Sequence, residues 1–252
     1  MPLSVPAVDK AVRILRFLNR RGDNGGALPE ISAALGLTRS HCFNILGTLL
    51  AQGWLAHDSA THRYRLAAGL LADCSSLMVA PGRAEAVRDI LRGLSRAAGL
   101  PSVLTRVLPG DGGFVALDKA EETSELIISF PIGHVFPADS PAQRRAVLAC
   151  LDPARAAAWI EAWRPVAYTA NTIVDRATLV AEIAATRQRG YAVSRGELHL
   201  AVMSLATAVR DQSGEPTFVL QLPGLFDDVT GREAEIARAL LDATSRLEAL
   251  RS

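Results

Sequence analysis

The sequence predicts an α+β protein with a small, mostly helical N-terminal domain and a larger C-terminal domain built on a largely antiparallel sheet. Three observations support this fold class. Helical periodicity dominates the first hundred residues, β-rich segments alternate with helices after them, and 252 residues with 49% apolar side chains can form two modest hydrophobic cores. The expected domains are residues 1–66 and 82–252, joined by a linker helix over residues 67–81.

Residues 28–55 are predicted to form two short helices joined by a tight turn. Gly36 ends the first helix, since glycine adopts a positive φ at little cost. Thr38 is a candidate N-cap for the second helix. In that second helix, apolar residues recur at helical spacing, at Cys42, Ile45, Leu46, Leu49 and Leu50. A short helix, a glycine turn and a second helix with a polar, partly basic face is the layout that places side chains in a DNA major groove.

A first helix over residues 7–21 and a hairpin after residue 53 complete a winged helix-turn-helix. Val8, Val12, Leu15 and Leu18 lie at helical spacing in the first helix, and the segment GDNGG (22–26) is expected to be a loop. The hairpin strands, 54–56 and 64–66, flank the polar segment HDSATHR.

The hairpin is a candidate wing whose Arg63 and Arg65 are placed to meet phosphate. The predicted DNA-binding residues are Thr38, Arg39, Ser40, His41, Asn44, Thr48, Arg63 and Arg65. An ordinary helical hairpin with a solvated polar face is the alternative interpretation.

The charge distribution favours a nucleic-acid-binding module at the N-terminus. The whole chain carries +1, but residues 1–70 hold eight basic and four acidic side chains, a net charge of +4. The remainder carries −3. A basic N-terminal segment followed by a slightly acidic remainder is consistent with DNA as the partner of the first domain.

Cysteine usage and hydropathy predict a cytoplasmic protein. Cys42, Cys74 and Cys150 lie far apart in apolar helical patterns, which indicates free thiols in a reducing compartment. No apolar run approaches the ~18–20 residues of a membrane span, and the first residues lack a secretory signal pattern. We therefore expect no membrane partner.

The C-terminal domain is predicted to begin with a helix that ends at Ala98 and to continue with alternating strands and helices. Strands are predicted at residues 102–108, 114–119, 125–130, 191–194, 202–209 and 217–222. Helices are predicted from Ser140-Pro141 to near Cys150, from Asp152-Pro153, from an Asp175 cap to Gly190, and from Thr230 in capping-box spacing with Glu233.

The sequence offers no sign of an active site. It contains no G-x-S-x-G elbow, phosphate loop, G-x-G-x-x-G or H-E-x-x-H motif, and its histidines lack metal-ligand spacing. Carboxylates at Asp118 and Glu121, or Glu197 beside His199, could serve acid–base chemistry, but surface charge beside a strand is the simpler interpretation. We predict a protein that is not an enzyme and that holds no cofactor and no metal.

The chain resembles the IclR family of bacterial transcription regulators over nearly its whole length. The resemblance lies in VDKAVRILRFL (8–18), ISAALGLTRSHCFNILGTLLAQGWL (31–55), YRLAAGLL (64–71), ALDKAE (116–121), TLVAEIAATRQRGYAV (178–193) and VMSLATAVRDQSGEP (202–216). It implies a winged helix-turn-helix, a linker helix and a GAF-like effector domain. It also implies a homodimer or tetramer that binds a palindromic double-stranded operator and responds to a small-molecule effector, often an organic or aromatic acid.

The resemblance maps the recognition helix to residues 39–51. Asn44 stands where the family often has a basic residue, which suggests a different operator sequence. Asn44 could pair with adenine, worth ~1–3 kcal/mol of discrimination, or contact only a phosphate. Repression and activation both remain open.

The resemblance maps effector contacts onto the C-terminal domain, at Ile128, Phe136, Ala142, Gln143, Ser194, Val202, Ser204, Gln221 and Pro223. The chain departs from the family where PAQRRA (141–146) replaces the usual small-Gly-Lys-Ala signature, where Ser194 replaces an acidic residue and where Ala201 replaces glycine.

A pocket with these neutral and apolar residues favours a neutral or aromatic ligand. Arg144, Arg145 or the helix start at 140–142 could still receive a carboxylate. Three alternatives stay open: a pocket that no longer binds anything, a ligand-binding sensor or enzyme with a vestigial helix-turn-helix, and an architectural DNA-binding dimer without effector.

Overall fold

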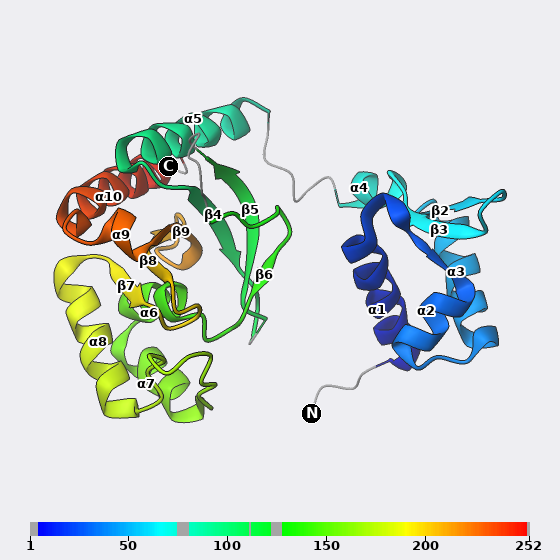
Figure 1. Ribbon diagram of the computed structural model, residues 1–252, viewed down its shortest axis with the longest axis horizontal. Helices are drawn as coiled ribbons and strands as arrows, with labels where there is room; N and C mark the ends of the chain where they lie inside the picture. Colours follow the sequence, from blue (N-terminus) through cyan, green and yellow to red (C-terminus); the bar gives the residue numbers. More distant parts are fainter. Residues whose placement is uncertain (1–4, 75–80, 111, 122–127, 251–252) are drawn as a thin grey trace. The chain divides into compact units, whose positions relative to one another are not determined.

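The computed structural model describes residues 5–74, 81–110, 112–121 and 128–250. The chain forms two compact units, one up to residue 79 and one from residue 80 onward, and each is described by itself (Figure 1). The elements of the N-terminal unit are α1 (Pro6–Arg21), η1 (Gly22–Asn24), β1 (Gly26–Ala27), α2 (Leu28–Leu35), α3 (Arg39–Ala51), β2 (Leu55–Asp58), β3 (Arg63–Leu66) and α4 (Gly69–Asp73).

The N-terminal core lies between α1, α2, α3 and the small sheet. Its buried residues include Ile14, Leu18, Ile31 and Leu46. In α1 the inward face is set by residues 14, 17 and 18, whereas Val8 and Val12 of the predicted stripe are exposed. Apolar spacing identified the α1 helix correctly but did not identify which of its sides is buried, because the helix carries apolar residues on two faces.

The small sheet has three strands in the order β1-β3-β2, all antiparallel. Leu55 pairs with Leu66 in the predicted hairpin, while Gly26 pairs with Tyr64. The segment 22–26, expected to be a loop, thus contains a 3-10 turn and the beginning of a third strand. A two-residue strand in a glycine-rich segment has no periodic signal of its own.

The helix predicted over residues 67–80 is described only at its start. Its described part is α4, which ends at Asp73, and residues 75–80 lie outside the described ranges. The Trp54 indole Nε1 donates a hydrogen bond of 2.6 Å to Asp73 Oδ2, which links α4 to the segment between α3 and β2. The next helix begins at Pro81.

The C-terminal unit contains one six-stranded antiparallel sheet in the order β6-β5-β4-β9-β8-β7. Its strands are β4 (Ser102–Val107), β5 (Phe114–Ala120), β6 (Val135–Phe136), β7 (Ala192–Arg195), β8 (Val202–Arg210) and β9 (Pro216–Leu225). Its helices are α5 (Pro81–Ala98), α6 (Pro141–Cys150), α7 (Pro153–Ala162), α8 (Arg176–Arg189), α9 (Phe226–Val229) and α10 (Glu233–Ala249). The antiparallel α+β prediction is confirmed.

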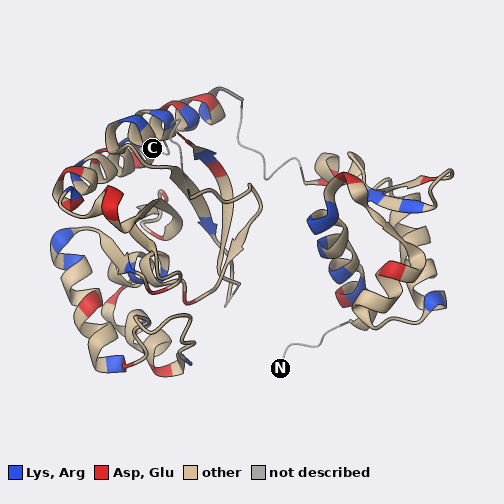
Figure 2. Cartoon of the chain, in the orientation of Figure 1, with Lys and Arg blue, Asp and Glu red and all other residues tan. Residues whose placement is uncertain are grey.

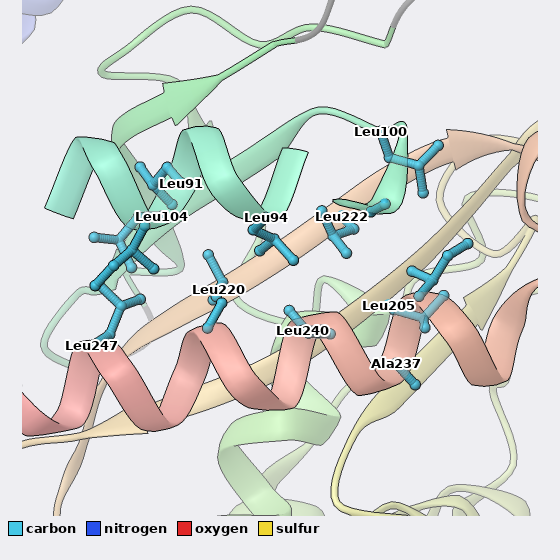
Figure 3. Close-up of a cluster of buried hydrophobic side chains, with 14 of the residues drawn as sticks. Leu91, Leu94, Leu100, Leu104, Leu205, Leu220, Leu222, Ala237, Leu240 and Leu247 are labelled. Atoms are coloured by element: carbon cyan, nitrogen blue, oxygen red, sulfur yellow. The ribbon is translucent and has the colours of Figure 1, made fainter. Parts of the chain in front are cut away.

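The two faces of this sheet carry separate cores because side chains alternate along each strand. Leu205, Leu220 and Leu222 on one face pack against α5 and α10 (Figure 3). Ala206, Val219 and neighbouring small residues on the other face pack against α6. Helices α7 and α8 then cover the outer side of α6 through a smaller cluster around Leu148 and Trp163.

Two local predictions differ from the structure. Residues 128–130 of the predicted strand 125–130 are not in a strand and its first three residues lie outside the described ranges, while an unpredicted short strand, β6, pairs with β5. The capping box at Thr230 does not form. Thr230 ends α9, and α10 begins after Arg232, so the Glu233 carboxylate accepts hydrogen bonds from Tyr191 and Arg195 instead.

None of the helices in the described ranges combines the length and apolar character that a bilayer span requires.

Candidate functional site

Helix α3 begins with a side-chain cap and presents one polar face to solvent. The Thr38 hydroxyl oxygen accepts a hydrogen bond of 3.3 Å from the His41 amide, so Thr38 is the N-cap as predicted. Gly36, with φ +64°, ends α2 and completes the tight turn. The predicted DNA-contacting residues of this region are all exposed: Thr38, Arg39, Ser40, His41, Asn44 and Thr48. The opposite side of α3 is buried through Cys42, Ile45, Leu46 and Leu49.

Two further residues of α3 lie on the exposed side and escaped the sequence analysis. Phe43 is 58% exposed and Gly47 is exposed one helical turn later. The signal was available, since both positions fall off the apolar stripe at 42, 45, 46 and 49. Arg39 is the one Lys or Arg in α3, and it stands at the N-terminal end of the helix (Figure 2).

The two arginines of the hairpin differ in their surroundings. Arg63 donates to both carboxylate oxygens of Glu30, at 3.1 and 2.9 Å, and to the carbonyl oxygens of Asn24 and Gly25. This hydrogen bond from Arg63 holds the pKa of Glu30 below its usual value. Arg63 therefore anchors the hairpin to α2, and its predicted contact with phosphate stays a prediction. Arg65 is exposed.

A hollow of about 390 Å³, open solvent included, lies in the C-terminal unit between the sheet and the start of α6. Its lining includes seven of the nine predicted effector residues: Phe136, Ala142, Ser194, Val202, Ser204, Gln221 and Pro223. The remaining lining residues are Phe130, Ser140, Pro141, Leu198 and His199. Residues far apart in the sequence thus meet around one space.

Strand register explains why the polar lining residues meet. Ser194 of β7 pairs with Ser204 of β8, which pairs with Pro223 of β9. These three positions form a row across the sheet, and Gln221, two residues before Pro223, points to the same face. Both Ser194 and Gln221 are buried.

Aromatic side chains form another wall of the hollow. The rings of Phe130 and Phe136 lie 4.8 Å apart between centroids in an edge-on arrangement, and the His134 ring, which is outside the lining, packs 4.6 Å from Phe136. Burial lowers the pKa of His134, which favours its neutral form. The hollow therefore combines an apolar side with hydroxyl and amide groups.

Two predicted effector residues do not line the hollow. Gln143 is fully buried, and its Nε2 donates to Thr105 Oγ1 at 3.3 Å. Ile128 is half-buried and outside the lining. The sequence analysis missed Phe130, Leu198 and His199 as lining residues, because they lie outside regular strands and helices and have no periodic signal.

Glu197 is buried rather than a surface charge. Its carboxylate receives two hydrogen bonds from the Arg145 guanidinium, one of 3.0 Å from Nη1 and one of 2.5 Å from Nη2, and Arg145 also donates to the carbonyl of Val193. The Arg145 guanidinium is therefore paired with the Glu197 carboxylate. The neighbouring Arg144 donates to the Ala138 carbonyl and lies over the rings of Phe114 and Trp159.

Among the described residues, no group of three or more His, Cys, Asp or Glu side chains is arranged to hold a metal ion. The three cysteines are free thiols, and burial raises the pKa of Cys42 and of Cys150.

Comparison with known proteins covers both units. Residues 7–59 match the family described as IclR helix-turn-helix domain, and residues 84–249 match the family described as bacterial transcriptional regulator IclR C-terminal. The chain is 30% identical to the HTH-type transcriptional regulator Rv1719 of Mycobacterium tuberculosis, over 97% of this chain and 92% of that protein.

Solved structures agree with the sequence relatives. An IclR transcriptional regulator from Alicyclobacillus acidocaldarius superposes with a TM-score of 0.83 at 26% identity, covering 99% of this chain and 100% of that one. An IclR homolog from Microbacterium hydrocarbonoxydans, solved in complex with 4-hydroxybenzoate, has a TM-score of 0.80 over 97% and 98% of the two chains. At 14% identity this second likeness concerns the fold alone.

Proposed function

Because this chain belongs to the IclR family of bacterial transcription regulators, we propose that α3 binds an operator in double-stranded DNA and that a small organic molecule in the C-terminal hollow modulates this binding. The observation that carries the proposal is the exposed face of α3, where five of the predicted DNA-contacting residues and the Thr38 cap meet solvent while the opposite side forms the core.

The proposed DNA contact uses α3 in the major groove. Arg39 at the start of the helix can donate to guanine or phosphate, and Asn44 can pair with adenine or contact a phosphate. Arg65 on the hairpin is placed for phosphate. In a homodimer or tetramer, two copies of α3 would read two half-sites of a palindrome about one helical turn apart.

The proposed ligand is a small aromatic or other organic acid, or a neutral derivative. Phe130 and Phe136 offer an apolar wall, and Ser194 and Ser204 offer neutral hydrogen-bonding groups. A carboxylate would suit the start of α6, where residues 140–142 line the hollow, because free amides and the helix dipole favour negative charge there. The 4-hydroxybenzoate complex of the Microbacterium relative makes aromatic acids the first compounds to test.

The proposed mechanism is a population shift. A ligand that binds one arrangement of the oligomer better than another changes the operator affinity by that difference in binding free energy. We propose a cytoplasmic regulator that acts through binding and without catalysis.

The test is operator binding by the full chain. A footprint on the DNA upstream of its own gene identifies a site, and mobility shifts with and without candidate acids measure the modulation. We expect Arg39→Ala and Asn44→Ala to lose operator binding while ligand binding is retained. The absence of operator binding under every condition would contradict the proposal.

Two rival functions predict different results. A sensor or enzyme with a vestigial helix-turn-helix binds its ligand but shows no DNA phenotype in the Arg39 and Asn44 variants. An architectural DNA-binding protein binds the operator, but calorimetry detects no acid, and Ser194 and Ser204 variants behave like the wild type.

A further inference from the structure

The exposed side of α3 carries an aromatic ring that folding of the unit does not require. Phe43 is 58% exposed, although its helix has a well-formed buried side at Cys42, Ile45 and Leu46. The exposed part of the phenyl ring gains nothing from folding, since only apolar surface that becomes buried is stabilised. Packing within the folded unit therefore does not account for the exposed part of Phe43.

Gly47 lies beside Phe43 and is also unexplained by the fold. The two residues are four apart in α3, so they are neighbours on the helix surface. A Cβ added at Gly47 would meet no atom within 4 Å, and its φ is not positive. Glycine destabilises a helix interior relative to alanine. Neither packing nor backbone conformation calls for glycine at this position.

We propose that the Phe43 ring contacts the C5-methyl group of a thymine in each half-site, and that Gly47 leaves room for the base edge at that point. This inference rests on the proposed function, in which α3 enters the major groove. Thymine is the one DNA base that presents a methyl group there, and phenylalanine is among the side chains that contact it. Arg39, four residues before Phe43, places a cation on the same side of the helix.

The test removes the methyl group from the DNA and the ring from the protein. Single thymines of the footprinted operator are replaced, in both half-sites together, by deoxyuridine, which pairs identically but lacks the methyl group. At one position we expect wild-type binding to weaken by about fifteenfold, because burial of one methyl group contributes about fourfold in each half-site. Phe43→Ala should bind the thymine and deoxyuridine operators equally well, and Phe43→Leu should keep part of the discrimination.

Other outcomes would contradict either the inference about Phe43 or the proposed function, and the experiment distinguishes the two. If Phe43→Ala weakens binding but the deoxyuridine penalty persists, the methyl group is read by another residue. If wild-type protein binds the operator without distinguishing thymine from deoxyuridine at any position, the inference about Phe43 is wrong and the proposed function stands. If the wild type binds no operator, the proposed function itself fails.

Gly47→Ala tests the space beside the ring, with Gly93→Ala as its matched control. Gly93 lies in α5 of the other unit, and a Cβ added there also meets no atom within 4 Å. Both variants should raise the thermal midpoint of their own unit, because alanine favours helix. Only Gly47→Ala should weaken operator binding, by about tenfold or more. If Gly47→Ala binds the operator as tightly as the wild type, the inference that a base edge lies close to Gly47 is wrong.

Discussion

The Arg145 guanidinium and the Glu197 carboxylate form a two-point ion pair in the interior of the C-terminal unit, with 3.0 Å between Nη1 and Oε2. Arg145 belongs to α6, and Glu197 follows β7. Leu198, next to Glu197, and Ala142, about one helical turn before Arg145 on α6, both line the hollow. The ion pair thereby fixes two walls of the candidate ligand site relative to each other.

Removing one partner of this pair should destabilise the C-terminal unit strongly. Arg145→Met leaves the Glu197 carboxylate buried without its cation, which costs ~3–5 kcal/mol of unfolding free energy. The double variant Arg145→Met/Glu197→Leu should lose less than the sum of the single losses. Urea unfolding followed by Trp159 and Trp163 fluorescence measures these differences.

An exposed ion pair provides the control. Arg155 and Glu215 lie 2.6 Å apart, and both side chains are about half exposed. Arg155→Gln should change the unfolding free energy far less than Arg145→Met does, because solvent-exposed ion pairs contribute little. Equal effects of the Arg145 and Arg155 variants would mean that burial does not determine the strength of the Arg145 pair.

The parts of this structure that follow from local sequence were predictable. The buried stripe of α3, its Thr38 cap and the wing strands depend on residues a few positions apart, so periodicity and capping preferences identify them. Arg145 and Glu197 are 52 residues apart, and the local sequence around either residue does not predict that they pair. The same holds for Arg63 and Glu30, whose pairing anchors the hairpin to α2. Most lining residues of the hollow were predicted from the family resemblance. They lie on different strands, and composition and periodicity do not show which strands are neighbours.

The two hairpin arginines should differ in their effect on DNA binding. Arg65→Gln removes a proposed phosphate contact in each subunit, so operator affinity should fall for all sequences, and the slope of log K against log salt should decrease by about 1.8 for two subunits. Arg63→Gln should lower the stability of the hairpin but leave the salt slope unchanged, because Glu30 and backbone carbonyls already engage the Arg63 side chain. Fluorescence anisotropy titrations between low and physiological salt measure both slopes. A reduced salt slope for Arg63→Gln would show that Arg63 also contacts a phosphate.

The pairing of Glu30 with Arg63 should make the N-terminal unit sensitive to acid. The folded-state pKa of Glu30 is lowered from an ordinary value of 4.5. Its stabilising contribution is therefore present above pH 4.5 and is lost as pH falls through the folded-state pKa. Glu30→Gln should be less stable than the wild type at pH 7, with the difference shrinking below pH 4.5. Trp54 fluorescence, with Trp159 and Trp163 replaced by phenylalanine, reports unfolding of this unit. A constant difference from pH 7 to pH 3 would contradict the assignment.

The α3 cap should contribute measurably to the stability of the DNA-binding helix. Thr38→Ala leaves the His41 amide without its side-chain acceptor, which costs ~1 kcal/mol, whereas Thr38→Ser should restore most of it. Thr48→Ala is the control on the same helix. The Thr48 hydroxyl donates only to the Asn44 carbonyl one turn earlier, so its removal should be neutral or slightly stabilising. Hydrogen exchange of α3 amides measures both effects, and equal protection in Thr38→Ala and wild type would show that the cap adds nothing.

Filling the hollow should separate ligand response from DNA binding. Ser204 lies in the middle of the row between Ser194 and Pro223, so Ser204→Leu places a larger side chain where the ligand is proposed to bind. We expect calorimetry with 4-hydroxybenzoate and related aromatic acids to detect binding of at least one acid by the wild type. In Ser204→Leu its affinity should fall by about tenfold or more, because the added atoms occupy the space of the ligand.

Operator binding of Ser204→Leu without ligand should stay within about twofold of wild type, and its modulation by the acid should disappear. Ser245→Leu makes the same change on the exposed side of α10 and should leave both properties unaltered. If Ser204→Leu binds the acid as tightly as wild type, the ligand occupies another site. If the variant loses acid binding but the acid still shifts operator affinity, the modulation does not pass through this hollow, because an effector can change the equilibrium only where it binds.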